Sequence, residues 1–137
     1  MNILFFLKPK SDLAYIKDYH TLRQALEIME YHKYSSVVII NKEGKYVGTI
    51  TEGDLLWGLK KLDLLNIKDA ENISILKIDR RRDYNCVKVE CDIEDLIDKA
   101  MEQNYVPVVD DADHFIGIIT RRDIINYCYN KMKEADK

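Results

Sequence analysis

The sequence predicts a mixed α/β (α+β) fold in which one small unit occurs twice. The main observation is an internal repeat: residues 47–56 return as 116–125, and both copies read apolar-Gly-x-Ile-Thr-x-x-Asp followed by two aliphatic residues. Two further observations are apolar stripes at helical spacing and short β-branched runs, which predict amphipathic helices and buried strands respectively. A duplicated unit of this length is typical of a supersecondary element whose copies bury each other's apolar faces.

The first copy begins with an extended segment at about 13–16. A helix is expected after Thr21, because Thr21 and Gln24 have the spacing of a capping box. Its apolar stripe recurs at i, i+3, i+4 and i+7 and comprises Leu22, Ala25, Leu26 and Met29. The remaining elements are expected to be a strand at 36–40, a turn at 41–45, a strand at 46–50 and a helix that begins at Thr51.

The second copy repeats this order. An extended segment at 86–89 precedes a helix capped by Asp92, and the later elements are strands at 107–109 and 115–119 and a helix that begins at Thr120. Upstream of the shared motif, 34–38 is matched with 105–109, which places Ser36 opposite Pro107. This match lies at a larger offset than the motif, so the turn after the first strand is expected to be longer in the first copy.

Composition excludes several classes of protein. A chain of 137 residues holds one compact domain or two very small ones. Its net charge of −3 argues against general nucleic-acid binding, and no apolar stretch approaches the roughly 20 residues that a membrane span needs. The apolar run 3–7 is expected to be too short for a signal peptide, and three cysteines without Cys-x-x-Cys spacing favour a reducing, cytoplasmic location without a metal site.

The duplicated Gly-x-Ile-Thr-x-x-Asp, the segment 105–110 (Tyr-Val-Pro-Val-Val-Asp) and the element order resemble a stand-alone tandem pair of CBS domains, a Bateman module, over about 7–130. The resemblance implies two β-α-β-β-α repeats packed through their sheets about a pseudo-twofold axis, with two clefts between them. It assigns 1–60 to the first repeat, 61–73 to a linker and 74–137 to the second repeat. Family members typically bind AMP, ADP, ATP, S-adenosylmethionine or cyclic di-AMP, act as regulatory sensors and pair into dimers.

The Thr-x-x-Asp motif has two interpretations. As local structure, threonine caps the free amides of a helix and the aspartate suits its positive end. As a binding site, a helix N-terminus attracts phosphate and a carboxylate accepts hydrogen bonds from a ribose diol. By resemblance, Asp54 and Asp123 would hold ribose, and Thr51 and Thr120 would hold phosphate.

Five of the six arginines form two clusters, one of Arg80, Arg81 and Arg82 and one of Arg121 and Arg122. Both clusters are assigned to the second repeat, and arginine suits phosphate oxygens. The site that contains Asp123 is therefore expected to take the more anionic ligand, and a phosphorylated ligand is favoured over S-adenosylmethionine. Alternatively, the first cluster is a solvated run that pairs with Asp79 and Asp83.

An adenine pocket needs apolar walls and a few backbone hydrogen bonds. The resemblance places it at the extended segment that precedes each first helix and on the buried strands. The candidates are Lys10, Ala14, Tyr15 and Val37 in the first repeat and Cys86, Val87, Pro107 and Val108 in the second. The alternative is that many of these residues only form core.

The leading hypothesis is an adenine-nucleotide-binding regulatory module without a catalytic domain, since no nucleophile, base and orienting acid gather in one motif. The resemblance implies a homodimer, and the regulatory output would pass to a separate effector protein or to the oligomeric state. The alternative is a CBS-fold dimeric interaction scaffold that binds no nucleotide. Trp57 has two interpretations, as part of a dimer contact or as part of the core.

Overall fold

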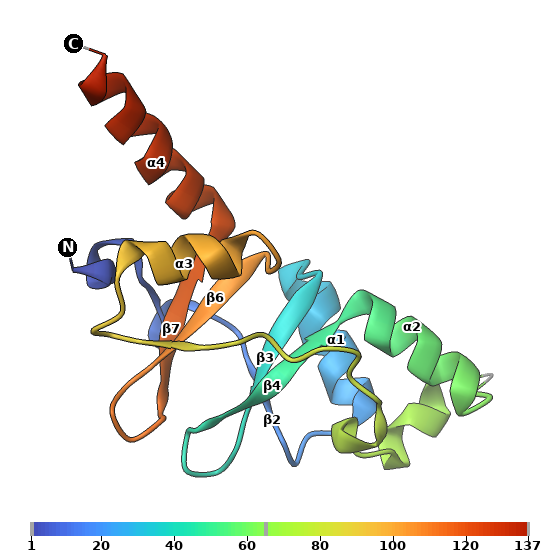
Figure 1. Cartoon of the computed structure of the whole chain (residues 1–137). Coiled ribbons are helices and arrows are strands. Elements are labelled where there is room, and N and C mark those ends of the chain that lie inside the picture. The colour runs from blue at the N-terminus through green and yellow to red at the C-terminus, as the bar shows by residue number, and fades with distance from the viewer. Residues whose placement is uncertain (1, 65, 137) are drawn as a thin grey trace. The chain divides into compact units, whose positions relative to one another are not determined.

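The computed structural model describes residues 2–64 and 66–136 (Figure 1). The chain divides into two compact units. The first unit is Ala14–Asp83 and carries the first repeat; the second unit combines the residues up to Leu13 with those from Tyr84 onward and carries the second repeat.

The first unit contains a three-stranded sheet in the order β2-β3-β4, formed by β2 (Ile16–Lys17), β3 (Ser36–Ile40) and β4 (Tyr46–Thr51). β2 is parallel to β3, and β3 is antiparallel to β4. Its helices are α1 (Leu22–His32) and α2 (Glu52–Lys61), followed by the short 3₁₀ helices η3 (Ile67–Asn72) and η4 (Ile75–Lys77). Every residue of β3 is buried, as expected for a strand that reads as a continuous apolar run.

Helix α1 forms where the capping box predicts it. The Gln24 amide donates to Thr21 Oγ1 at 3.2 Å, and the Thr21 amide donates to Gln24 Oε1 at 2.8 Å. The stripe buries Leu22, Ala25 and Met29 against the sheet core. The helix ends at Lys33, whose φ of 58° is left-handed, the usual conformation of a helix C-cap.

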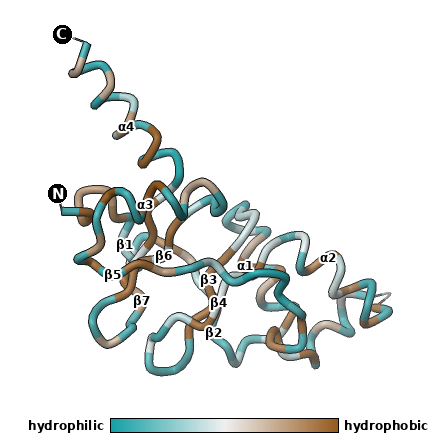
Figure 2. Tube along the Cα trace, viewed as in Figure 1, coloured by the Kyte–Doolittle hydropathy of each residue, from teal (hydrophilic) through white to brown (hydrophobic). Residues whose placement is uncertain are grey.

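The second unit has a four-stranded sheet in the order β1-β7-β6-β5, formed by β1 (Lys8–Pro9), β7 (Phe115–Thr120), β6 (Tyr105–Val109) and β5 (Val87–Lys88). Its helices are α3 (Ile93–Ala100) and α4 (Arg121–Ala135), with the 3₁₀ helices η1 (Ile3–Phe6) and η2 (Lys10–Asp12) near the N-terminus. The hairpin loops of both units are hydrophilic (Figure 2), as the turn composition predicts. No described helix is both long and apolar enough to cross a membrane.

The register of the two hairpins corrects the sequence match. Ser36 pairs with Thr51, and Tyr105 pairs with Thr120, so β3 and β6 correspond at the same offset as the shared motif. Pro107 is therefore equivalent to Val38, and the match of Pro107 with Ser36 is wrong. The turns are equal in length; the difference lies in the first helix, which has 11 residues in α1 and 8 in α3.

The two units also divide the chain differently from the repeats. Ala70, Ile75 and Ile78 belong to the core of the first unit, so the expected linker and the residues after it pack there. At the other end, Lys8 pairs with Ile118 in the second unit. Gly117 makes this pairing possible, because its φ of 157° and the nearby Lys8 carbonyl leave no room for a Cβ.

Candidate functional site

The first repeat's Thr-x-x-Asp motif is fully engaged in protein contacts. Thr51 caps α2 by accepting from the Asp54 amide at 3.1 Å, and Asp54 Oδ2 accepts from the Thr51 amide at 3.0 Å. The second carboxylate oxygen, Oδ1, accepts from the Arg81 amide at 3.1 Å. Asp54 is only 2% exposed. Its carboxylate therefore already satisfies two backbone donors.

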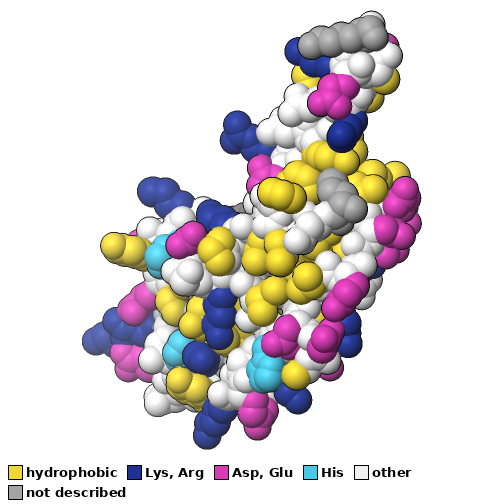
Figure 3. Space-filling view, turned by 90° about the vertical axis from the view of Figure 1, so that its left-hand side faces the viewer, with side chains coloured by type: hydrophobic (Ala, Val, Ile, Leu, Met, Phe, Trp, Pro, Cys, Tyr) yellow, Lys and Arg dark blue, Asp and Glu magenta, His cyan; other side chains and the backbone are white. Residues whose placement is uncertain are grey.

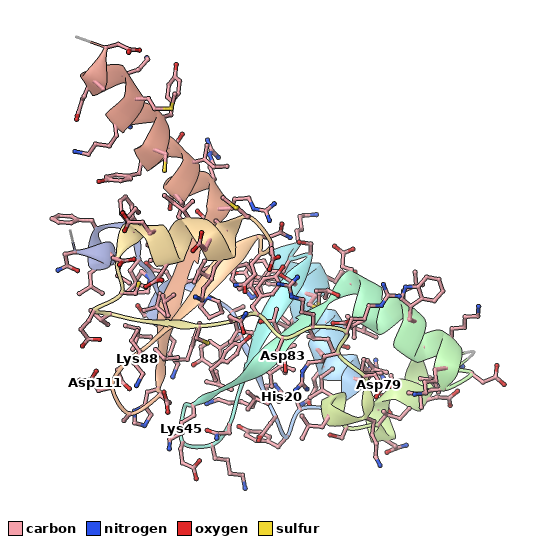
Figure 4. All side chains as sticks on the ribbon, viewed as in Figure 1. His20, Lys45, Asp79, Asp83, Lys88 and Asp111 are labelled. Carbon is pink, nitrogen blue, oxygen red and sulfur yellow. The ribbon has the colours of Figure 1, made fainter. Side chains whose placement is uncertain are left out.

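The segment that delivers Arg81 is fixed to strand β4 by a second carboxylate. Asp83 Oδ1 accepts from the Thr49 amide at 3.1 Å and from Arg80 Nε at 2.7 Å. The hydrogen bond to Asp83 is also the main reason why the pKa of the Arg80 guanidinium is raised above its usual value. Figure 4 labels Asp79 and Asp83 toward the two ends of this segment.

These contacts show where the first arginine cluster packs. Arg80 and Arg81 lie in the first unit, where Arg80 pairs with Asp83 and the Arg81 guanidinium stands over the Trp57 ring at 5.4 Å. Arg82, which is exposed, lies in the same unit. The cluster thus packs in the first unit, although the family model that is reported below counts residues 77–130 as the second repeat. The alternative pairing of Arg80 with Asp83 is present. Sequence spacing could not locate this run, because its position depends on tertiary packing.

The motif at the start of α4 in the second repeat makes fewer hydrogen bonds to the described residues than the motif of the first repeat. Thr120 caps the helix by accepting from the Asp123 amide at 3.2 Å. Asp123 is half-buried, and no hydrogen bond to its carboxylate is found among the residues that the structure describes. Arg122 beside it is exposed. The two equivalent aspartates thus differ: Asp54 is buried and bonded, whereas Asp123 can accept hydrogen bonds from a ligand.

Arg121 has a structural contact that the sequence did not reveal. Its Nε donates to the carbonyls of Ala100 at 2.7 Å and Gln103 at 3.0 Å. The Ala100 carbonyl belongs to the last turn of α3 and the Gln103 carbonyl follows it, and a cation there offsets the negative end of the helix. Of the two arginines in the motif, Arg122 is the one whose side chain extends into solvent.

A buried glutamine holds the segment that leads into β5. Gln103 is 1% exposed; its Oε1 accepts from the Asn85 amide at 2.8 Å, and its Nε2 donates to the carbonyls of Asn85 and Tyr105, both at 3.2 Å. Gln103 fixes the backbone next to Cys86, one of the expected adenine contacts. Sequence reasoning missed it, since a single glutamine after a helix gives no periodic or motif signal.

The other candidates for the adenine pocket have mixed surroundings. In the second unit, Cys86 is half-buried, whereas Val87, Pro107 and Val108 are buried. The first-repeat candidates Ala14, Tyr15 and Val37 lie in the first unit, and Lys10 lies in η2 of the second unit.

Val37 is 2% exposed and belongs to the first core. The Ala14 amide donates to the Tyr34 hydroxyl at 3.4 Å. Val37 therefore acts as core in the first unit, and Ala14 and Tyr15 are only half-buried.

A small hollow of about 180 Å³ adjoins the engaged aspartate of the first repeat. Its lining combines Asp54, Trp57 and Arg81 with the side chains of Lys61 and Lys77. Lys61 is paired with Asp79 at 2.5 Å, and this bond raises the pKa of Lys61 and lowers that of Asp79. No group of three or more histidine, cysteine or acidic side chains that could hold a metal occurs in the described part of the chain.

Comparison with known proteins identifies the family. Residues 7–61 and 77–130 match the family model of the CBS domain, so the chain belongs to the CBS-domain family and contains a tandem pair. An uncharacterized protein of Methanocaldococcus jannaschii is 29% identical over 127 residues, which cover 85% of this chain and 45% of that protein. The chain spans between 23% and 48% of the length of the curated relatives it matches.

Two solved structures have the same fold. CbpB in complex with c-di-AMP superposes with a TM-score of 0.84 at 23% identity, covering 99% of this chain and 89% of that one. CBSX2 in complex with AMP gives a TM-score of 0.73 at 22% identity, covering 96% of this chain and 98% of that one. The predicted family and the predicted mixed fold of two repeats are thus confirmed.

Proposed function

We propose that the chain is a regulatory module that binds an adenine nucleotide, with the residues of the second repeat as its principal binding groups. The observation that carries the proposal is the state of Asp123, a half-buried carboxylate at the start of α4 without a hydrogen-bond partner among the described residues. Such a carboxylate can accept both hydroxyls of a ribose diol. Its equivalent, Asp54, is already bonded to two amides.

The ligand of the proposal is AMP, ADP, ATP or cyclic di-AMP. The fold neighbours CbpB and CBSX2 are described in complex with c-di-AMP and AMP respectively, which supports this class. Arg122 is exposed next to Asp123 and next to the N-terminus of α4, and both features favour phosphate. S-adenosylmethionine, which carries a sulfonium instead of a phosphate, fits these groups less well.

We propose that the module regulates by binding its ligand and catalyses no reaction. A ligand shifts an equilibrium only by its differential affinity for two states, so the signal passes either to a separate effector protein or to the association of two copies. A cytoplasmic location is part of this proposal, because these nucleotides occur there. The cysteines are free thiols, which is compatible with a reducing location; they are Cys86, Cys91 and Cys128.

A thermal-shift panel tests this function. AMP, ADP, ATP, cyclic di-AMP and S-adenosylmethionine are each added to the purified chain, with GTP as the control for nonspecific phosphate binding. At 100 times its dissociation constant, a specific ligand stabilises the protein by about 2.7 kcal/mol. A shift with at least one adenine nucleotide and none with GTP supports the proposal, and no shift with any adenine ligand favours the interaction scaffold.

Association of two copies is a second proposal, and exposed apolar surface supports it. Figure 3 shows hydrophobic side chains gathered where α4 joins the rest of its unit. There, Ile97, Met101, Ile125 and Met132 line a groove of about 400 Å³ between α3 and α4, with Arg121 in its wall. The first unit has an equivalent groove of about 710 Å³ between α1 and α2.

The walls of the two grooves differ in charge. Glu30, Glu52 and Lys33 line the first groove, which leaves one excess negative charge, whereas Arg121 lines the second at the position equivalent to Glu52. Opposite charges favour contact between the first groove of one copy and the second groove of another. Light scattering after size exclusion tests this: Leu56→Arg, within the first groove, is expected to give monomers, and Leu76→Arg, an exposed apolar residue outside both grooves, is expected to leave the dimer intact.

A further inference from the structure

Residues 78–83, named here the strap, run along the first unit and are held at both ends. At one end, Ile78 is 2% exposed and packs so closely on Gly58 that an added Cβ there would lie 2.7 Å from Ile78 Cδ1. At the other end, Asp83 accepts from the amide of Thr49, a residue that is fully buried in β4. The strap is therefore ordered by apolar packing and by a charged acceptor.

The middle of the strap covers the first repeat's motif. The Arg81 amide occupies Asp54 Oδ1, while the Thr51 amide occupies Oδ2. The Arg81 side chain lies over Trp57, three residues after Asp54 on α2. A ribose hydroxyl that approaches Asp54 would have to displace the hydrogen bond from the Arg81 amide.

We propose that the strap is an autoinhibitory contact: it blocks Asp54, so that the chain binds one nucleotide through the second repeat and a second one only when the strap lifts. The inference rests on the proposed function and concerns how many ligands the chain takes and in which order. The second repeat shows the contrast, because its equivalent carboxylate, Asp123, has no bound amide among the described residues. A covered site binds with an apparent affinity reduced by the fraction of time it is open.

Asp83 is the side chain that fastens the strap. One of its oxygens joins the Thr49 amide to Arg80 Nε, and the other accepts from the second nitrogen of the guanidinium at 3.3 Å. Gly48 leaves room for the pair formed by Asp83 and Arg80, because a Cβ at Gly48 would collide with the carboxylate of Asp83 and with Arg80. Two different substitutions, Asp83→Ala and Gly48→Ala, therefore release the strap by loss of its acceptor and by steric displacement.

The experiment counts AMP molecules on the intact chain by native mass spectrometry and measures their affinities by calorimetry. Wild type, Asp83→Ala and Gly48→Ala are compared, with Asp79→Ala as the matched control. Asp79 is also an aspartate of the strap and lines the hollow beside Asp54, but its carboxylate is exposed and pairs with the exposed Lys61 instead of fastening the strap to β4. Hydrogen exchange at the Arg81 amide reports in each variant whether the strap has lifted.

Wild type and Asp79→Ala are expected to bind one AMP tightly, and both released variants are expected to bind a second AMP at least about tenfold more tightly than wild type does. Asp54→Ala in the released background is expected to abolish only the second binding event. The proposal is overturned if wild type already binds two AMP with equal affinity, or if the Arg81 amide exchanges faster without a gain in AMP. Gly48→Ala decides the outcome where Asp83→Ala fails to fold.

The failure of the proposed function gives a different result. In that case neither wild type nor the Asp79→Ala control binds AMP, ADP, ATP or cyclic di-AMP, whereas failure of the strap alone leaves the first AMP in place and changes only the second. If a released variant binds AMP and wild type binds none, the strap is upheld and the role of the second repeat is refuted. Absence of AMP from every variant refutes the strap proposal, and it refutes the proposed function as well when ADP, ATP and cyclic di-AMP also fail to bind.

Discussion

The two motif aspartates provide a direct test of how the repeats differ, through the paired substitutions Asp54→Ala and Asp123→Ala. Asp54 is 2% exposed and accepts from the amides of Thr51 and Arg81. Removing a buried acceptor strands its donors, at a cost of about 1–3 kcal/mol for each donor that water cannot reach. Because Arg81 is exposed and its amide can be partly rehydrated, the total for Asp54→Ala is about 2–3 kcal/mol.

Asp123→Ala removes a carboxylate that has no hydrogen bond among the described residues. Its loss is limited to the interaction of a negative charge with the N-terminus of α4, which is about 0.3–1 kcal/mol. Thr120 still caps the helix, since its hydroxyl accepts from the backbone amide at position 123. The stability cost at position 54 should therefore be about twofold or more larger than that at position 123.

Urea unfolding of the ligand-free proteins, followed by circular dichroism, measures both costs under one condition. In thermal unfolding, the predicted difference corresponds to a melting temperature that is lower by roughly 6–10 °C for Asp54→Ala and by only about 1–3 °C for Asp123→Ala. Equal losses, or a larger loss for Asp123→Ala, would refute the reasoning, because they would mean that the Arg81 and Thr51 contacts do not stabilise the first repeat.

Three other predictions concern the supporting contacts. Arg121→Ala should lose about 1–2 kcal/mol of unfolding free energy because α3 loses its cap, and Arg122→Ala should lose less than about 0.5; equal values in urea would contradict this. Gln103→Leu should cost about 2–3 kcal/mol, since the Asn85 amide loses its acceptor, and an unchanged urea midpoint would count against it. Burial lowers the pKa of His20 below 6.5, so the neutral ring contributes its full share of the folding stability above about pH 6.5, and this share is lost as the pH falls through the lowered pKa. Urea unfolding of wild type and His20→Leu between pH 7.5 and 5 measures this loss. A parallel pH dependence of the two stabilities would argue against it.

Much of the fold could be predicted because local signals agree with tertiary structure. The capping box at Thr21 and Gln24 forms as expected, and Thr51 and Thr120 cap the helices that they precede. These features depend on hydrogen bonds within four residues of each other. Helix starts and buried strands therefore follow directly from the residues.

The register of the strands was harder to predict. Matching Tyr34 with Tyr105 aligned two identical residues but shifted β3 against β6 by two positions. The pairing of each strand with the next one in its hairpin shows that Tyr105 corresponds to Ser36 instead. A shift of two keeps the same face of the strand buried, so the hydrophobic pattern could not reveal the error. The equal length of the two turns is seen only in the strand pairing, where Ile40 pairs with Tyr46 and Val109 pairs with Phe115.

The candidate site shows the same limit. The motif residues are where they were expected, but their availability depends on contacts across the fold: Asp54 meets an amide 27 residues away in the chain, and Gln103 meets Asn85 at a distance of 18 residues. The arginine run at 80–82 was interpreted by its charge and its place in the repeat, whereas its backbone and its neighbour Asp83 determine where it packs. Such long-range backbone contacts carry no sequence signal.

Calorimetric titration of AMP and of cyclic di-AMP into wild type and Asp123→Ala tests the central claim most directly. We expect that at least one of these ligands binds the wild-type chain, and that Asp123→Ala weakens this binding by about tenfold or more, as expected when charge-assisted hydrogen bonds are lost. Its small effect on stability makes the loss attributable to the ligand. Equal affinity of both proteins, or no heat with either ligand, would contradict the assignment of the second repeat as a nucleotide-binding site.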